Sequence, residues 1–157
     1  MKRRKFLAVG GLAFGAGYAL YRSRTPSIPN DMDVDTLYTE GNVFGLPVLG
    51  YREQSYTIIA DGETADTEFR DDHPDGSDFA EETNFEESYI LVAQYGTRSE
   101  EDLVLDSIER IESGLRVAIS VDKPFLIDHD DLKTHSYLIR ITDKEGVPDS
   151  VDLTIAE

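Results

Sequence analysis

The sequence predicts an all-β fold, an antiparallel β-sandwich or partly open barrel of about six to eight strands. Three observations carry this prediction. Tyr89–Ala93 is a continuous apolar run, long enough for a strand buried on both faces. Residues 115–121 alternate between apolar and polar side chains, as in a strand with one buried face. After residue 36 no segment has a long 3.6-residue apolar period, so short strands separated by polar turns favour a sandwich or barrel.

The N-terminal part of the chain predicts a linker followed by one β domain over residues 36–157. Residues 25–35 contain Pro, Ser and Asn, which is typical of an extended, poorly packed linker. Residues 42–50 (NVFGLPVLG) predict an edge strand or a packed loop, because Pro cannot donate to a central ladder. Residues 55–60 (SYTIIA) then predict a strand.

The C-terminal half predicts strands in close succession. A strand over 103–111 changes its apolar phase between Leu105 and Ile108, which indicates a β-bulge. A turn at Ser113-Gly114 joins it to the alternating strand as a hairpin. Two further strands are expected, with the sequences SYLIRIT (136–142) and VDLTI (151–155).

Composition and charge bound the function. The chain has 157 residues and no Cys, which excludes disulfides, thiolate zinc sites and a cysteine nucleophile. Six of the fifteen Lys and Arg residues lie in the first 24, so residues 25–157 hold nine bases against all 32 acids, a formal charge of −23. Such self-repulsion opposes compaction at low ionic strength and is screened beyond roughly 3 Å at 1 M salt. The chain is similar in this to extracytoplasmic proteins of halophilic archaea, and its charge argues against nucleic acid as a partner.

Residues 1–24 predict a targeting segment, a signal or signal-anchor helix. A basic start is followed by 16 uncharged residues, 6–21, which is short for a membrane span and close to the apolar region of a signal peptide. Arg3 and Arg4, followed by Phe6 and Leu7, resemble a twin-arginine export signal. The alternative is a generic positive-inside anchor. A cleaved leader would give a secreted protein, and an uncleaved one would tether the domain to the outer face of the membrane.

An acidic stretch over residues 61–87 predicts a solvated loop, since its twelve acids face a single base. Within it, residues 63–69 are consistent with a short helix or a further strand. Asp71, Asp75 and Glu82 fall at positions 1, 5 and 12 of an EF-hand-like loop, which makes a Ca²⁺ site over 71–82 an alternative hypothesis. His73 at position 3 departs from the EF-hand pattern, and diffuse cation condensation is the simpler expectation.

The remaining titratable residues give weaker signals. His73, His129 and His135 stand in polar, acidic surroundings, where a His/Asp metal site competes with the expectation of surface histidines. Four arginines lie on or beside strands, and we expect cross-strand pairs with acids such as Asp106, Glu109 and Glu112 rather than a patch for an acidic partner. These four arginines are Arg98, Arg110, Arg116 and Arg140.

Residues 84–96 (NFEESYILVAQYG) resemble the first of the strands that characterise the PrcB C-terminal domain family, small exported β domains. The likeness extends loosely over about 52–142. It implies at most a binding or complex-stabilising module. Where that family often carries a Pro-Thr-Gly-Gly-Tyr-like loop, this chain has Thr97–Leu103, so no role tied to that loop is carried over.

The sequence contains no serine-hydrolase elbow, no His-Glu-x-x-His motif and no glycine-rich phosphate loop before a helix, so we expect no enzyme and no cofactor. The prediction is an exported or membrane-tethered binding or scaffold module whose partner is another surface protein. Contact with the membrane is expected only through an uncleaved N-terminal segment.

Overall fold

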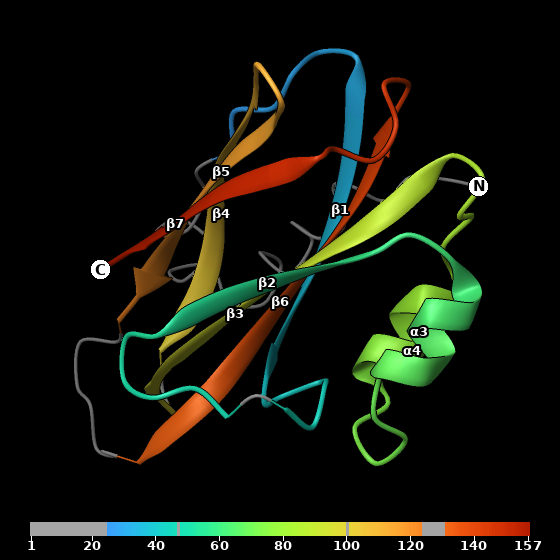
Figure 1. Ribbon diagram of the computed structural model, residues 1–157. Helices are drawn as coiled ribbons and strands as arrows, with labels where there is room; N and C mark the ends of the chain where they lie inside the picture. The colour runs from blue at the N-terminus through green and yellow to red at the C-terminus, as the bar shows by residue number, and fades with distance from the viewer. Residues whose placement is uncertain (1–24, 47, 100, 124–130) are drawn as a thin grey trace.

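The computed structural model describes residues 25–46, 48–99, 101–123 and 131–157. Within them the chain forms seven strands and two short helices (Figure 1). The N-terminal elements are β1 (Met32–Glu40), β2 (Gln54–Ile59), α3 (Gly62–Glu68) and α4 (Asp75–Glu81). The rest are β3 (Ser88–Arg98), β4 (Asp102–Ile111), β5 (Gly114–Asp122), β6 (Leu132–Asp143) and β7 (Ser150–Ala156).

The strands form two separate sheets and no closed barrel, so the sandwich prediction holds and the barrel alternative does not. One sheet has the order β1-β6-β3-β2 and is antiparallel throughout. The other has the order β4-β5-β7, with an antiparallel β4–β5 hairpin and a parallel β5–β7 pair. The expectation of purely antiparallel sheets was wrong at β7, because the chain enters β7 from β6 in the other sheet rather than by a hairpin from β5.

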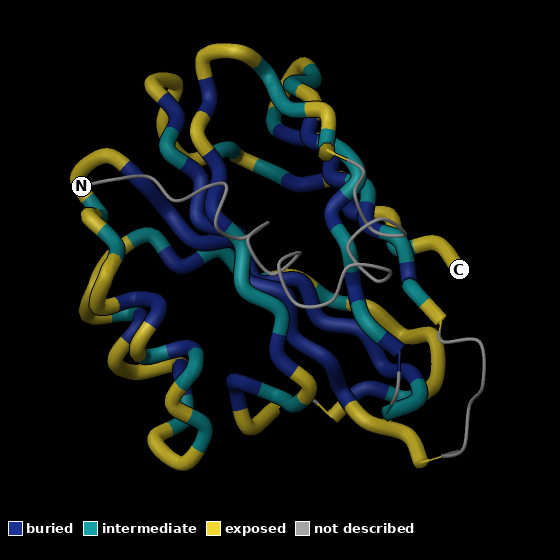
Figure 2. The backbone as a smooth tube through the Cα atoms, turned by 180° about the vertical axis from the view of Figure 1, so that it is seen from behind, coloured by how far each residue is buried: buried dark blue, intermediate teal, exposed yellow. Residues whose placement is uncertain are grey.

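The molecule has three layers, because the four-stranded sheet is covered on both faces. Alternate residues of β3 face the three-stranded sheet, and the residues between them face the helices, so every residue from Ser88 to Thr97 is buried. Figure 2 shows these central strands buried, while the outer surfaces of the helices are exposed. The prediction that residues 89–93 form a strand buried on both faces is therefore confirmed.

The predicted β-bulge is also confirmed, and it has a structural role. The β4–β5 register shifts between Leu105 and Ser107. At this point Ser27 pairs with the free edge of β4: its N–H donates to the Asp106 carbonyl at 2.9 Å, and its carbonyl accepts from the Ile108 N–H at 2.9 Å. Residues 25–35, expected to be a linker, are thus part of the domain, and β1 begins at Met32, which is buried in the core.

The acidic stretch 61–87 contains two helices. The expectation of a loop was wrong for α4, whereas α3 confirms the short-helix alternative predicted for residues 63–69. Asp61 caps α3 by accepting the Thr64 N–H at 2.7 Å. Phe69 stacks on Phe44 with ring centroids 5.2 Å apart, and α4 packs closely enough on Phe69 that a Cβ atom at Gly76 would lie 2.3 Å from its ring. A few apolar side chains thus fold a segment whose acids all remain on the outside.

Residues 42–46 and 48–50 form a packed loop, the second of the two alternatives predicted for this stretch. Val43, Phe44 and Leu49 are buried. The loop is held to β6 by hydrogen bonds in which the Val43 N–H donates to the Ser136 hydroxyl and the Leu49 N–H donates to the Thr134 hydroxyl.

Candidate functional site

The residues proposed for a Ca²⁺ loop are not brought together as a loop. Asp75 is the first residue of α4 and Glu82 follows its last, so they stand about 10 Å apart along the helix axis. The His73 ring packs against Gly41, where a Cβ atom would lie 2.5 Å from Nε2. Within the described ranges, no three or more His, Asp or Glu side chains converge in a way that could hold a metal ion.

The other predicted site residues separate into three groups. Arg3, Arg4, Phe6 and Leu7 of the export signal lie outside the described residues, as does His129. Arg116 makes the expected cross-strand pair with Glu109 at 3.9 Å and a closer one with Asp152 at 3.2 Å. Arg110 binds a different carboxylate from those expected, that of Asp143 on β6, in a bidentate pair at 2.8 and 2.9 Å.

Arg140, on β6, connects α4 to the four-stranded sheet. Its guanidinium lies 4.1 Å from the centre of the Phe79 ring and donates to the Phe79 carbonyl at 3.0 Å, near the end of α4. On β1, the Asp35 carboxylate accepts from Arg140 at 3.1 Å, and both side chains are only 10% exposed. The remaining oxygen of this carboxylate, Oδ1, is buried without a hydrogen-bond partner among the described residues.

His135 is not a surface histidine but is fully buried at the end of β6, between the two sheets. Its Nδ1 lies 2.7 Å from the Tyr38 hydroxyl, and its Nε2 lies 2.8 Å from the Arg98 carbonyl. Burial lowers its pKa, an effect that outweighs the hydrogen bond to the Arg98 carbonyl and the negative charge of Glu40. A nearby buried carboxylate, that of Glu101, accepts a hydrogen bond from the Thr97 hydroxyl.

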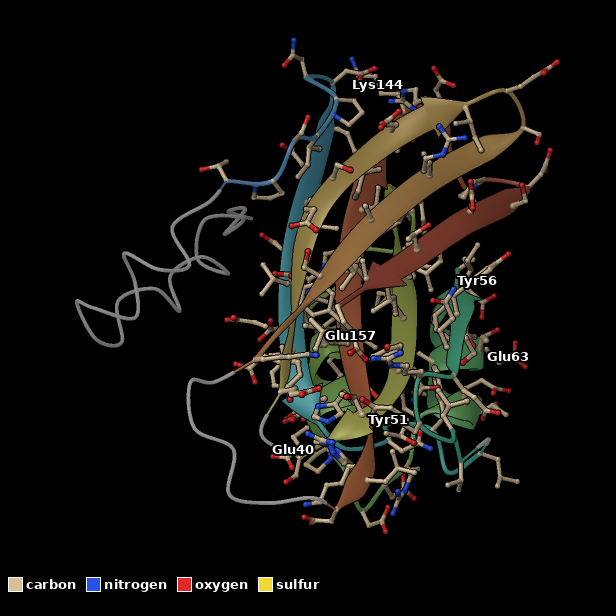
Figure 3. All side chains as sticks on the ribbon, turned by 90° about the vertical axis from the view of Figure 1, so that its left-hand side faces the viewer. Glu40, Tyr51, Tyr56, Glu63, Lys144 and Glu157 are labelled. Atoms are coloured by element: carbon tan, nitrogen blue, oxygen red, sulfur yellow. The ribbon has the colours of Figure 1, made fainter. Side chains whose placement is uncertain are left out.

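Next to this cluster, three donors from different elements converge on one carboxylate, that of Glu157. Arg52 donates Nε to Oε2 at 3.1 Å and Nη2 to Oε1 at 2.9 Å. The Tyr95 hydroxyl on β3 donates to Oε2 at 2.9 Å, and Lys123 Nζ, just after β5, donates to Oε1 at 2.9 Å. We call these four residues the Glu157 site. Figure 3 shows Glu157 near the middle of the sandwich's height and Tyr51 nearer the end that lies opposite Lys144.

The electrostatics of the Glu157 site are those of a strongly bound anion. The Lys123 and Arg52 hydrogen bonds, with that of Tyr95, lower the pKa of Glu157 to about 2. Burial and the carboxylate that it faces raise the pKa of Tyr95 to about 12, so its hydroxyl keeps its proton and remains a donor. The Glu157 side chain is 13% exposed, whereas that of Arg52 is 61% exposed. The anion is therefore enclosed by two solvent-accessible cations, Arg52 and Lys123, and by the buried Tyr95.

The same end of the molecule exposes apolar side chains. In the loop between β1 and β2, Leu46 is 79% exposed, Val48 is 75% exposed and Tyr51 is about half exposed. Leu132, at the start of β6, is also exposed and lies two residues from Thr134, to which this loop is hydrogen-bonded. We call Leu46, Val48, Tyr51 and Leu132 the apolar rim.

Side chains of β2 close the edge of the sandwich next to the site. The Gln54 side-chain amide donates to the Leu153 carbonyl of β7 at 2.9 Å, and the Val151 N–H donates to the Tyr56 hydroxyl at 3.4 Å. Together with the Arg52–Glu157 pair just outside the two strands, residues 52, 54 and 56 contact residues 157, 153 and 151. We call these contacts the seam. They satisfy polar groups that an edge strand would otherwise offer to another chain.

Sequence reasoning missed the Glu157 site entirely. Its members are distant along the chain and show no motif spacing. The one available signal was the rarity of bases: an Arg beside a Tyr in a Gly-rich loop stands out in a chain with so few cations.

Comparison with known proteins adds no assignment. No family model matches this sequence, and no curated protein and no solved structure matches it. Among the helices in the described ranges, neither has the length and apolarity needed to cross a bilayer.

Proposed function

We propose that this chain is an exported or membrane-tethered binding module that works in concentrated salt and has no catalytic role. In this proposal, its partner is another cell-surface protein, which contacts the end of the sandwich that carries the apolar rim. The observation that carries the proposal is the exposure of Leu46 and Val48 on a surface that is otherwise dominated by carboxylates. Apolar groups rimmed by polar ones are typical of interaction surfaces.

The packing of the loop that carries the apolar rim supports a role of the rim in recognition. The loop that bears it is not loosely attached, since its Val43, Phe44 and Leu49 side chains are buried and its backbone is bonded to β6. A rigid loop presents its exposed side chains at little entropic cost to a partner. The resemblance of residues 84–96 to the PrcB C-terminal domain family, a prediction from sequence, agrees with a complex-stabilising role.

The rim can be tested by replacing it. Tagged Leu46→Ser/Val48→Ser protein is compared with wild type in cross-linking and capture from envelope fractions in molar KCl. Val147→Ser is the matched control, because Val147 is also exposed but lies in the β6–β7 connection, next to the end marked by Lys144. We expect the same cross-linked partner with wild type and the control and its loss with the double variant. A partner that the double variant retains, or no partner at all, would contradict the proposal.

Adaptation to salt has its own test. The charge of −23 over residues 25–157 is screened only at high ionic strength. We therefore expect the circular dichroism of the domain to show strands in molar KCl and loss of structure at low salt. A domain that stays fully folded at low salt is not salt-adapted.

Export is tested on the native protein. Mass spectrometry of its N-terminus separates a cleaved, secreted form from a tethered form that retains residues 1–24. Replacing Arg3 and Arg4 together with Lys is expected to keep the protein inside the cell if the pair is a twin-arginine signal. Export that is unchanged by this replacement would favour a generic leader.

A further inference from the structure

The Glu157 side chain is held in the way that a protein holds a bound carboxylate ligand. It accepts four hydrogen bonds, two of them from the planar fork of Arg52. Two positive charges, those of Arg52 and Lys123, face this one side-chain carboxylate. Bidentate arginine is the usual means by which proteins recognise a planar carboxylate, and an ordinary surface ion pair needs no such set of donors.

The backbone of Arg52 is held in place independently of the carboxylate that its side chain binds. Arg52 has a φ of 68°, a left-handed conformation that is uncommon outside glycine. Its N–H donates to the Gly96 carbonyl at 2.7 Å, and the Gly96 N–H donates to the Glu53 carbonyl at 2.9 Å. Gly96 permits this contact, because a Cβ atom there would lie 2.0 Å from the Gly50 carbonyl oxygen. Strained backbone of this kind is concentrated at ligand-binding positions.

The residue that fills the site is easily released. The β5–β7 ladder ends at the pair Ser120–Ala156, so Glu157 lies one residue beyond it. Val151 and Leu153 anchor β7 in the core through their buried side chains. Neither of these side chains belongs to the Glu157 site. Displacement of Glu157 therefore leaves the β5–β7 ladder and the core residues of β7 in place, while the buried Tyr95 hydroxyl loses its acceptor.

We propose that Arg52, Tyr95 and Lys123 form a carboxylate-binding site, that Glu157 occupies it as an internal ligand, and that a glutamate side chain on an extended segment of the partner protein takes its place. The inference rests on the proposed binding function and supplies the chemistry by which the partner is recognised. The internal ligand defines that chemistry: a glutamate that follows extended apolar residues, as in Ile155-Ala156-Glu157. Tyr51 belongs to both surfaces, since the Arg52 guanidinium lies 5.3 Å from its ring centre, so one partner segment can contact the apolar rim and the site together.

The proposal predicts that removing the internal ligand uncovers a binding site. The probe is the tripeptide acetyl-Ile-Ala-Glu, titrated into the full-length Glu157→Ala protein at constant ionic strength. The Arg52 Nε–H resonance is followed by NMR. We expect a saturable shift of this resonance in the variant and binding at least about tenfold weaker in wild type, where the tethered side chain competes at a millimolar or higher effective concentration. Acetyl-Ile-Ala-Gln, which keeps the terminal carboxylate but has a neutral amide in place of the side-chain carboxylate, is expected to cause no saturable shift.

Two further arms fix the site and the ligand class. In Glu157→Ala/Tyr95→Phe, which removes only the hydroxyl donor, we expect the tripeptide to bind several-fold more weakly. Inorganic phosphate is titrated at the same ionic strength. A saturable response to phosphate but not to the tripeptide would overturn the carboxylate assignment, and a variant that responds to neither would overturn the site.

The outcomes separate this inference from the proposed function. A partner that wild type captures through Leu46 and Val48, together with no tripeptide binding to Glu157→Ala, would refute the carboxylate site and leave the binding module intact. Tripeptide binding without any captured partner would support the site and count against the proposed function.

Discussion

Two ionic centres of this protein use the same chemistry in opposite settings. At the helix-covered face, Arg140 and Asp35 form a pair in which each side chain is 10% exposed, and Arg140 also bonds the end of α4. At the end of the sandwich, Glu157 is comparably enclosed, but its partners Arg52 and Lys123 are 61% and 43% exposed. The cation of the first centre is therefore almost fully buried, whereas both cations of the second centre are in contact with solvent.

This difference separates an ionic group that maintains the fold from one that can exchange its partner. A buried charge that loses its counter-ion remains in a low-dielectric site, so removal of either member of the Arg140–Asp35 pair is costly. In the Glu157 site the cations are already hydrated on one side, so water or another carboxylate can replace Glu157 at little cost. Burial of the cation, rather than the number of hydrogen bonds, decides which centre is fixed.

The largest expected effect comes from breaking the buried pair. Arg140→Met leaves the Asp35 carboxylate buried without a counter-ion, and we expect a loss of about 3–5 kcal/mol in the free energy of unfolding. Chemical unfolding in molar KCl measures it. The double variant Asp35→Leu/Arg140→Met removes both charges and should recover most of the loss. Equal losses in the single and double variants would show that the hydrogen bonds to α4, and not the buried charge, account for the effect.

A smaller effect is expected from the packing of the helices above this pair. In Gly76→Ala the new methyl group would meet the Phe69 ring, and we expect destabilisation of about 2 kcal/mol. Thermal unfolding in molar KCl measures it. Gly62→Ala is the control, since nothing lies within 4 Å of its added Cβ atom. If both variants were equally stable, the helix pair would have room to move and would not be a fixed part of the core.

At the accessible centre we expect about 1 kcal/mol from Glu157→Gln near neutral pH, because the exposed cations are screened. The pKa of Glu157 is lowered from its ordinary 4.5 to about 2, so its contribution is complete above pH 4.5 and is lost as the pH falls towards 2. The difference in stability between wild type and the variant, measured by chemical unfolding, should shrink over this range. A difference that is constant from pH 6 to pH 2 would mean that Glu157 is not ionically bound.

The smallest effect is expected at the seam beside this centre. Tyr56→Phe removes one long hydrogen bond to the Val151 N–H, which is then left to water, and we expect a loss of about 0.5 kcal/mol or less. Hydrogen exchange is the more sensitive measurement and should show faster exchange at Val151 than in wild type. Unchanged exchange there would show that the seam does not protect β7.

The sequence predicted those strands whose burial can be read from the order of apolar and polar side chains over a few consecutive residues. The continuous apolar run of β3 requires other elements to cover both of its faces. The alternation of apolar and polar residues in β5 and β7 requires cover on one face. All three strands could therefore be predicted from side-chain periodicity. The bulge at Asp106 was visible as a change of phase. For α3 the sequence is consistent with either a helix or a strand, and it does not predict α4, because so few apolar residues lie in a stretch with twelve acids, Ala65, Phe69, Phe79 and Ala80 among them. The cover of these helices comes from β3, which follows α4 along the chain, and from β6, which is far away in sequence.

By itself, the amino-acid sequence determined the strand content, the central strand buried on both faces, the bulge and the high negative charge, because each depends on residues close together in the chain. Only the tertiary structure decided the parallel position of β7, the burial of His135, the Arg140–Asp35 pair and the Glu157 site. Each of these joins residues 34 or more positions apart, and electrostatic and hydrogen-bond energies depend on the distance between groups in space. The spacing of those residues along the chain does not indicate how close they lie in space.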